Sequence, residues 1–262
     1  MGEFVNHYLN EGVDSIIIID DESNSAIYDN VSQLSEVEIV KGVPFANGPE
    51  LDTVYKRIRA RYDWLVVVDM DEYVTTKQCP ERTLKEELLN TFKNADCVKI
   101  PWVMMAFNGL KENPACLLET NTFRWDHDLR HEPRSGHRKL RCRFESIEVK
   151  CAFRTRAFEA SWLHHPKRPA GDSVVVVDSV GNEPAPLDPF HSNLRERDIQ
   201  EAHLLCYHFR VTSQRQCNNK LRGNKINAYQ TLTADELRDW DYPERVDDTL
   251  SVKSKRRPKR FD

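Results

Sequence analysis

The stretch Trp64–Val68 (WLVVV) runs directly into Asp69–Tyr73 (DMDEY), and it decides how the chain is interpreted. Five consecutive apolar residues, three of them valines, predict a strand buried on both faces, as in the parallel sheet of an α/β protein. Ligands of such sheets bind beyond the carboxyl ends of the strands, so we expect Asp69 and Asp71 at a binding site. Carboxylates at positions i and i+2 can converge on one hard cation, and oxygen ligands suit Mg²⁺ or Mn²⁺.

The Asp-x-Asp triplet by itself is weak evidence for a metal site. It occurs twice more, at Asp126–Asp128 and Asp239–Asp241, and neither copy follows an apolar run. A solvated acidic turn explains such an isolated triplet equally well. The strand before Asp69 therefore singles out the first copy.

The rest of the first hundred residues alternates helical and strand-like segments. Apolar residues at helical spacing predict helices over 3–10 and 49–62, and Thr83 with Glu86 forms the capping box of a third helix. Apolar runs predict strands over 15–19, 37–40, 97–100 and 102–105. This alternation predicts an α/β fold, with a mostly parallel twisted sheet flanked by helices and a Rossmann-like nucleotide-binding half.

The later sequence is less regular. Residues 106–170 are polar, basic and aromatic, and we expect loops and short strands around a cleft there. Further strands are predicted over 174–177 and 204–209, and a helix over 213–221. Residues 231–262 form a polar C-terminal extension that ends in the basic run Lys253–Arg260, which is typical of a solvated tail.

Composition excludes several classes of protein. The chain has 262 residues, of which 39% are hydrophobic and 31% charged, as in an ordinary globular protein. No apolar stretch approaches a membrane span, and no secretory signal is visible. Seven cysteines without Cys-x-x-Cys spacing argue against a disulfide framework or structural zinc. We therefore expect a cytoplasmic protein, and the net charge of −4 implies no general attraction to nucleic acid.

Several motifs together resemble the GT-A glycosyltransferases, and more narrowly glycosyltransferase family 92 and related family-2-like enzymes. In chain order the matching pieces are Glu3–Tyr8 (EFVNHY), Gly12–Asp14, Ile19–Ser23 (IDDES), Asp63–Tyr73, Cys206–Arg210 (CYHFR) with Ser213, and Lys220–Gly223 (KLRG). The family has a His-Tyr-type strand where this chain has the order Tyr-His. The resemblance covers residues 3 to 225 and is loose in the middle third. It implies a single GT-A domain over 1–230, with a donor half over about 1–105 and an acceptor half over about 106–230.

The resemblance also implies a nucleotide-sugar donor, usually a UDP-sugar, bound through Mn²⁺ or Mg²⁺ at its diphosphate. Asp71 would hold the metal, and Asp69 would contact the metal or the ribose. Further candidates have ordinary structural alternatives as core, turn or surface residues. They are His208 as a third metal ligand, Lys220 and Arg222 at the diphosphate, and Asp20 and Asp21 at the uracil or ribose.

Most enzymes that this chain resembles invert the anomeric configuration and need a carboxylate base for the acceptor hydroxyl. The sequence does not choose among the candidates Glu119, Asp126, Asp128 and Glu145. The acceptor is expected to be a carbohydrate or glycoprotein. His164 and His165 before Pro166 resemble a family His-Pro element near the acceptor. Sugar rings could also stack on the indoles of Trp102, Trp125 and Trp162, although large aromatics are more often core residues.

The strongest alternative is a haloacid-dehalogenase-like phosphohydrolase, in which Asp69 attacks phosphorus and Asp71 protonates the leaving group. That family requires Thr or Val where this chain has Tyr73, and it places the motif on the first strand. A nucleotidyltransferase would have a Gly-rich phosphate loop near its start, which this chain lacks. A nucleic-acid-binding protein would leave the carboxylates after the apolar strand unexplained.

Overall fold

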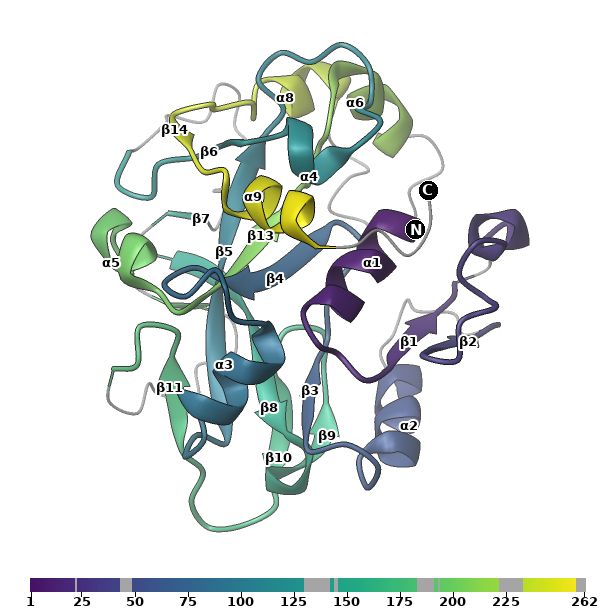
Figure 1. Ribbon diagram of the computed structural model, residues 1–262, viewed down its shortest axis with the longest axis vertical. Coiled ribbons are helices and arrows are strands. Elements are labelled where there is room, and N and C mark those ends of the chain that lie inside the picture. Colours follow the sequence, from purple (N-terminus) through teal and green to yellow (C-terminus); the bar gives the residue numbers. More distant parts are fainter. Residues whose placement is uncertain are drawn as a thin grey trace.

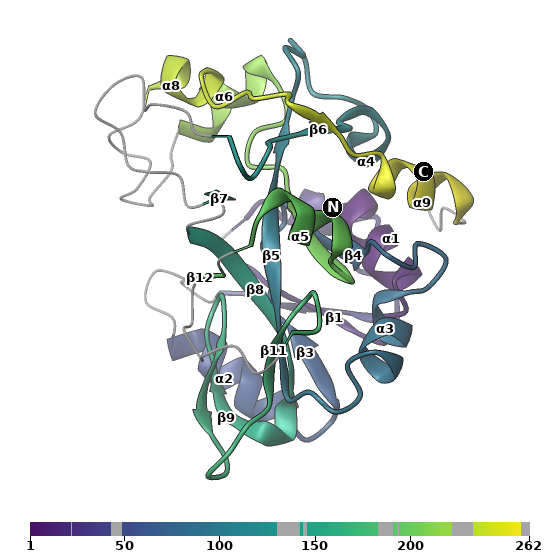
Figure 2. The same ribbon diagram turned by 90° about the vertical axis from the view of Figure 1, so that its left-hand side faces the viewer.

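The fold is built on one long central strand. The computed structural model describes residues 1–21, 23–42, 49–129, 142–143, 146–182, 191–192, 194–221 and 233–257. Strand β5 (Cys97–Ala106) is ten residues long, and each of its residues is buried. It runs from the upper to the lower part of the molecule in Figure 2, so elements at both ends pack against the same strand.

The main sheet is mixed. From one edge to the other lie β12 (His191–Ser192), β8 (Ser146–Arg154), β5, β13 (Leu204–His208) and β4 (Glu72–Thr76). β13 runs parallel to β5, whereas β8 and β4 run antiparallel to their neighbours. Among the further strands that join it are β11 (Val176–Asp178), parallel to β5, and β3 (Trp64–Val66), antiparallel to β8. The prediction of a mostly parallel sheet is therefore corrected, because β8 inserts between β3 and β5, and β4 follows the acidic turn without a crossover helix.

Strand β5 joins the two predicted strands that flank Pro101. Proline removes a backbone donor and is normally excluded from central strands. On one side of β5, β11 pairs with residues 97–99 and β13 pairs with residues 102–104. Pro101 falls in the gap between these two partners, so its missing N–H interrupts no ladder on that side.

The predicted helices form, and further short elements complete the fold (Figure 1). The helical elements are α1 (Gly2–Asn10), η1 (Ser25–Tyr28), α2 (Pro49–Ile58), α3 (Leu84–Asn90), α4 (Leu117–Thr120), η3 (Thr155–Ala157), α5 (Glu196–Glu201), α6 (Gln214–Leu221), α8 (Ala234–Arg238) and α9 (Thr249–Arg256). The remaining strands are β1 (Ile16–Ile19), β2 (Val37–Val40), β6 (Phe123–Arg124), β7 (Cys142–Arg143), β9 (Phe158–Ser161), β10 (Pro166–Pro169) and β14 (Arg245–Val246). The main core lies between α1, α3 and strands β4, β5 and β13. Among the described residues, no helix is long and apolar enough to cross a membrane.

Strands β1 and β2 stand apart from the main sheet. They pair with each other in parallel, and Ile16 lies opposite Val37. A cavity of about 1120 Å³ lies between β1 and the segment Trp64–Asp69, and both segments line it. The prediction that Trp64–Val68 is buried on both faces is therefore wrong: β3 ends at Val66 and is only half-buried.

The C-terminal segment packs on the fold instead of trailing from it. Helix α9 lies beside α1 (Figure 1), where Arg257 Nη1 donates to the Asn10 carbonyl. The Lys253 ammonium lies 2.8 Å from the Glu11 carboxylate, and both side chains are at most 4% exposed. The expectation of a solvated basic tail is wrong for Lys253. The division of the chain near residue 230 stays a prediction.

Candidate functional site

The acidic motif forms a tight turn between β3 and β4. The Glu72 amide donates to the Asp69 carbonyl at 3.0 Å, and the Asp69 amide donates to Glu72 Oε2 at 2.7 Å. The side chain of Asp69 is 52% exposed and that of Asp71 is 29% exposed, whereas Glu72 is completely buried. The turn therefore leaves Asp69 half-exposed and Asp71 partly exposed, and it directs the glutamate that follows them into the core.

Asp71 contacts two of the predicted site residues, His208 and Lys220. His208, at the end of β13, lies opposite Glu72 in the β4–β13 ladder. Its Nε2 is 3.6 Å from Asp71 Oδ1, and Lys220 Nζ on α6 is 2.9 Å from Asp71 Oδ2. Burial would raise the pKa of Asp71, but His208 and Lys220 hold it below its usual value. Burial lowers the pKa of His208.

These groups have the chemistry of a partial divalent-cation site. A neutral imidazole and an ionised carboxylate are the forms that bind metals. Atoms 3.6 Å apart can both reach one cation at about 2.1 Å. Among the described residues, no group of three or more His, Cys, Asp or Glu could hold a metal ion. A cation here would have two protein ligands, which suits Mg²⁺ or Mn²⁺ that is also held by substrate phosphates and water.

A buried lysine lies beneath the turn. The Lys150 ammonium, on β8, is 3.1 Å from Asp69 Oδ2 and 3.0 Å from Glu72 Oε2. Burial acts to raise the pKa of Glu72, whereas the Lys150 ammonium draws it down and favours the carboxylate. Burial acts to lower the pKa of Lys150, but Glu72 and Asp69 raise it above its usual value. The sequence alone does not predict this pair; its available signal is a lysine within the mostly apolar segment 147–153.

Asp20 and Asp21 follow β1 and line the cavity, together with Asp69. Asp20 is buried and accepts hydrogen bonds from Tyr28 Oη at 2.6 Å and from the Ser23 amide at 3.0 Å. The Tyr28 bond lowers the pKa of Asp20. Asp20 therefore organises the turn, as expected of at least one of the two, while Asp21 is exposed. Their contact with a nucleoside stays a prediction.

Of the predicted acceptor residues, Trp102 packs directly against His208, and His164 packs against Trp102. Trp102 on β5 is 5% exposed, and its ring centroid is 4.3 Å from that of His208 and 5.3 Å from that of His164. His164 Nδ1 lies 3.0 Å from the Val149 carbonyl, and burial lowers its pKa to about 4. His165 is buried against the Pro166 carbonyl. Their role in acceptor binding stays a prediction.

Two other tryptophans differ in environment. Trp125 is buried, and its Nε1 donates to the Trp240 carbonyl at 3.1 Å. Trp162 is only half-buried, and Lys167 Nζ lies 4.1 Å from its ring centroid. Trp162 therefore keeps more surface for a ligand than Trp125.

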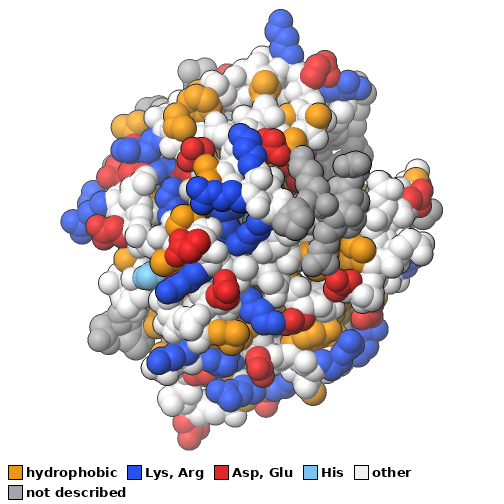
Figure 3. Space-filling view, in the orientation of Figure 1, with side chains coloured by type: hydrophobic (Ala, Val, Ile, Leu, Met, Phe, Trp, Pro, Cys, Tyr) orange, Lys and Arg blue, Asp and Glu red, His pale blue; other side chains and the backbone are white. Residues whose placement is uncertain are grey.

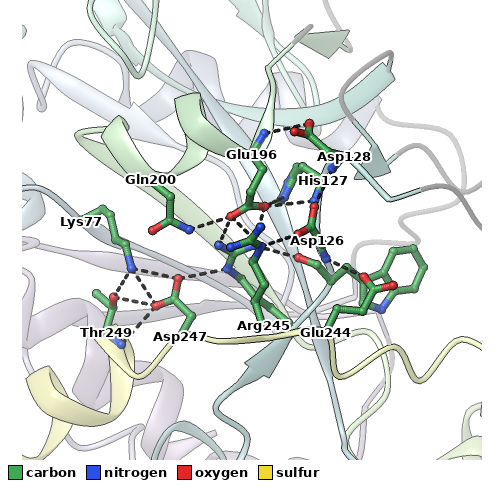
Figure 4. A network of polar contacts seen from close by, with 12 residues as sticks. Lys77, Asp126, His127, Asp128, Glu196, Gln200, Glu244, Arg245, Asp247 and Thr249 are labelled. Carbon is green, nitrogen blue, oxygen red and sulfur yellow. Dashed lines mark hydrogen bonds and ion pairs between the residues drawn. The ribbon is translucent and has the colours of Figure 1, made fainter.

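Two of the candidate bases belong to a polar network (Figure 4). Asp126 is buried, forms an ion pair with Arg245 and accepts the Asp128 amide at 2.8 Å. Asp128 is exposed and accepts the Glu196 amide at 3.1 Å, at the start of α5. The network continues through the buried ion pair between Glu196 and Arg124. Asp126 therefore has a structural role.

The remaining predicted site residues are Glu119, Glu145 and Arg222. Glu119 is half-buried in α4. Glu145 and Arg222 lie outside the described residues. Basic and acidic side chains are interspersed over the face shown in Figure 3, which agrees with the small net charge of −4.

Comparison with known proteins identifies the family of this chain. The family model described as glycosyltransferase family 92 matches residues 1–250. The matched segment includes the acidic turn, β13 with His208, and Lys220 on α6. A search of curated proteins found no match.

Proposed function

Because the chain belongs to glycosyltransferase family 92, we propose that it moves one sugar from a UDP-sugar to a glycan hydroxyl with the help of Mn²⁺ or Mg²⁺. The observation that carries this proposal is the convergence of Asp71, His208 and Lys220 beside the acidic turn. The cavity that Asp69 lines is large enough for a nucleotide ligand, since ligand pockets commonly span about 300–1,000 Å³. Family membership does not favour the phosphohydrolase alternative.

The proposed chemistry places positive charge where negative charge develops. As the glycosidic bond to the donor breaks, the nucleoside diphosphate leaves with an additional negative charge. A bound divalent cation would act there as a Lewis acid. Asp71 and His208 would hold the cation, and Lys220 would turn from Asp71 to a phosphate oxygen. Asp20, Asp21 and Asp69 would bind the nucleoside.

The acceptor hydroxyl would attack the anomeric carbon from the opposite face, with inversion. Its proton needs a carboxylate base within hydrogen-bond reach. Asp126 is already committed to a buried ion pair with Arg245, so it is the least suitable of the four candidates. Glu119, Asp128 and Glu145 remain for this role, and His164 and His165 would orient the acceptor.

Isothermal titration with UDP, in the presence and absence of Mn²⁺, tests the proposal. We expect metal-dependent binding in the wild type and a loss of that dependence in Asp71→Asn. Asp239→Asn is the matched control, because Asp239 belongs to a triplet that no apolar run precedes. If the wild type binds UDP equally with and without metal, or not at all, the metal-dependent mechanism is wrong.

The donor sugar is the next question. A screen of UDP-xylose, UDP-galactose, UDP-glucose and a rhamnose donor for slow hydrolysis identifies the sugar by its product. We expect one donor to be hydrolysed faster than the others in the presence of Mn²⁺. Asp71→Asn should abolish that hydrolysis, which separates it from contaminating activity.

A further inference from the structure

Lys150 is buried more completely than a lysine usually is. Its side chain has no exposed surface, although lysine is among the residues least often fully buried. Its ammonium donates to Asp69 Oδ2 and to the Leu163 carbonyl, each at 3.1 Å, and pairs with Glu72 Oε2 at 3.0 Å. An ammonium has three N–H donors, so these three acceptors, two from the acidic turn and one from Leu163, satisfy all of them.

The two carboxylates beside this lysine, Glu72 and Asp69, differ in whether they need its positive charge. A buried ammonium requires a buried counter-charge, and the fully buried Glu72 carboxylate provides it. Asp69 is 52% exposed, so water can solvate its carboxylate without any protein cation. Stability of the core therefore accounts for the pair of Lys150 with Glu72, but it does not require the contact with Asp69.

The contact with Asp69 restricts one oxygen of that carboxylate. Lys150 binds Oδ2, and among the described residues no hydrogen bond reaches Oδ1. Strand β8 fixes the lysine itself, because Lys150 pairs with Ile100 in the centre of the sheet. A rigid element thus holds a half-exposed carboxylate in one orientation at the edge of the cavity, with one oxygen left for a ligand.

We propose that Lys150 is a positioning residue, which orients the Asp69 carboxylate for the ribose or the metal of a nucleoside diphosphate donor. The inference rests on the proposed function and adds a residue to it. Partners that orient a ligand-binding carboxylate typically change affinity about 10- to 100-fold when they are removed.

The experiment removes the Asp69 contact without leaving a buried charge. Lys150→Met alone would leave Glu72 without a cation, so it is made in a Glu72→Gln background, where the new side-chain carbonyl oxygen can still accept the Asp69 amide. Glu72→Gln alone is the matched control, since it keeps the Lys150 ammonium with the Asp69 carboxylate as its counter-charge. Circular dichroism and thermal melting establish that each variant folds, and isothermal titration with UDP and Mn²⁺ gives Kd.

A second pair of variants tests whether Lys150 acts through Asp69. Lys150→Met is compared with its background again when both carry Asp69→Ala. We expect UDP affinity to fall about 10- to 100-fold with Asp69 present and to be unchanged by Lys150→Met with Asp69 absent. A purely structural role would give the same loss in both backgrounds and would overturn the inference.

The remaining outcomes are also distinct. Equal Kd values for Glu72→Gln and the Glu72→Gln, Lys150→Met double variant overturn the role of Lys150 and leave the proposed function intact. A wild-type protein that does not bind UDP overturns both.

Discussion

Replacing Lys253 by methionine should destabilise the protein strongly. The ammonium is 4% exposed and lies 2.8 Å from Glu11, whose side chain is 1% exposed. It also donates to Thr76 Oγ1 at 2.7 Å and to the Arg82 carbonyl at 3.0 Å. Lys253→Met keeps most of the apolar stem but removes the charge and all of these bonds.

The size of the effect follows from these contacts. Removing one partner of a buried ion pair costs about 3–5 kcal/mol, because the other charge stays buried. Arg257 Nη1, 3.3 Å from Glu11, retains part of the compensation, so we expect the lower end of that range. A loss of about 3 kcal/mol corresponds to a fall of roughly 6–12 °C in Tm for a domain of this size.

Urea unfolding measures this loss. Circular dichroism and tryptophan fluorescence should give coincident transitions before a free energy is extracted. Lys255→Met is the control, since Lys255 is exposed on the same helix and should cost at most about 0.5 kcal/mol. Equal stabilities of the two variants would show that the Lys253–Glu11 pair does not hold α9 on the fold.

Three further predictions concern other polar groups. Lys220→Met should tighten Mn²⁺ binding in the absence of nucleotide, because it frees Asp71, and should weaken UDP binding; titration that shows neither change refutes the exchange of partners. Glu196→Gln should lower the free energy of unfolding by about 2–3 kcal/mol, because it weakens the buried pair with Arg124, whereas Glu201→Gln on the exposed surface of α5 should not. Burial lowers the pKa of His164 to about 4, so the unfolded state takes up the proton first. Stability should therefore fall as the pH falls from about 6.5 to about 4, and urea titrations of His164→Gln should show a shallower slope there.

The parts of the fold that local patterns specify could be predicted. Helix α3 begins at the predicted capping box, and β1 and β2 form where the apolar runs lie. Asp71 and His208 also meet as expected, because β4 and β13 are neighbours and His208 lies opposite Glu72. Local periodicity was sufficient for the helix and the strands, whereas the resemblance to the family indicated His208 as a partner of Asp71.

Long-range pairing could not be predicted. Nothing local indicates that β8 lies antiparallel to both β3 and β5, so the sheet was expected to be mostly parallel. The same limit hid Lys150, whose burial depends on Glu72 in another strand, and Lys253, whose partner Glu11 lies near the other end of the sequence. A charged residue has the same local pattern whether it meets water or a buried counter-charge.

The contacts that hold α9 against α1 have a consequence for the order of folding. Arg257 bonds to the Asn10 carbonyl across a sequence separation of 247 residues, and Asp247 pairs with Lys77 across 170. Contacts of such separation form late, since closing long loops costs entropy before the contacts reward it. During synthesis, Glu11 lacks its partner, the Lys253 ammonium, until residues 247–257 have left the ribosome. We therefore expect α9 to dock late, on a helix α1 that already packs against β4 through Tyr8, whose Oη donates to the Glu72 carbonyl at 2.9 Å.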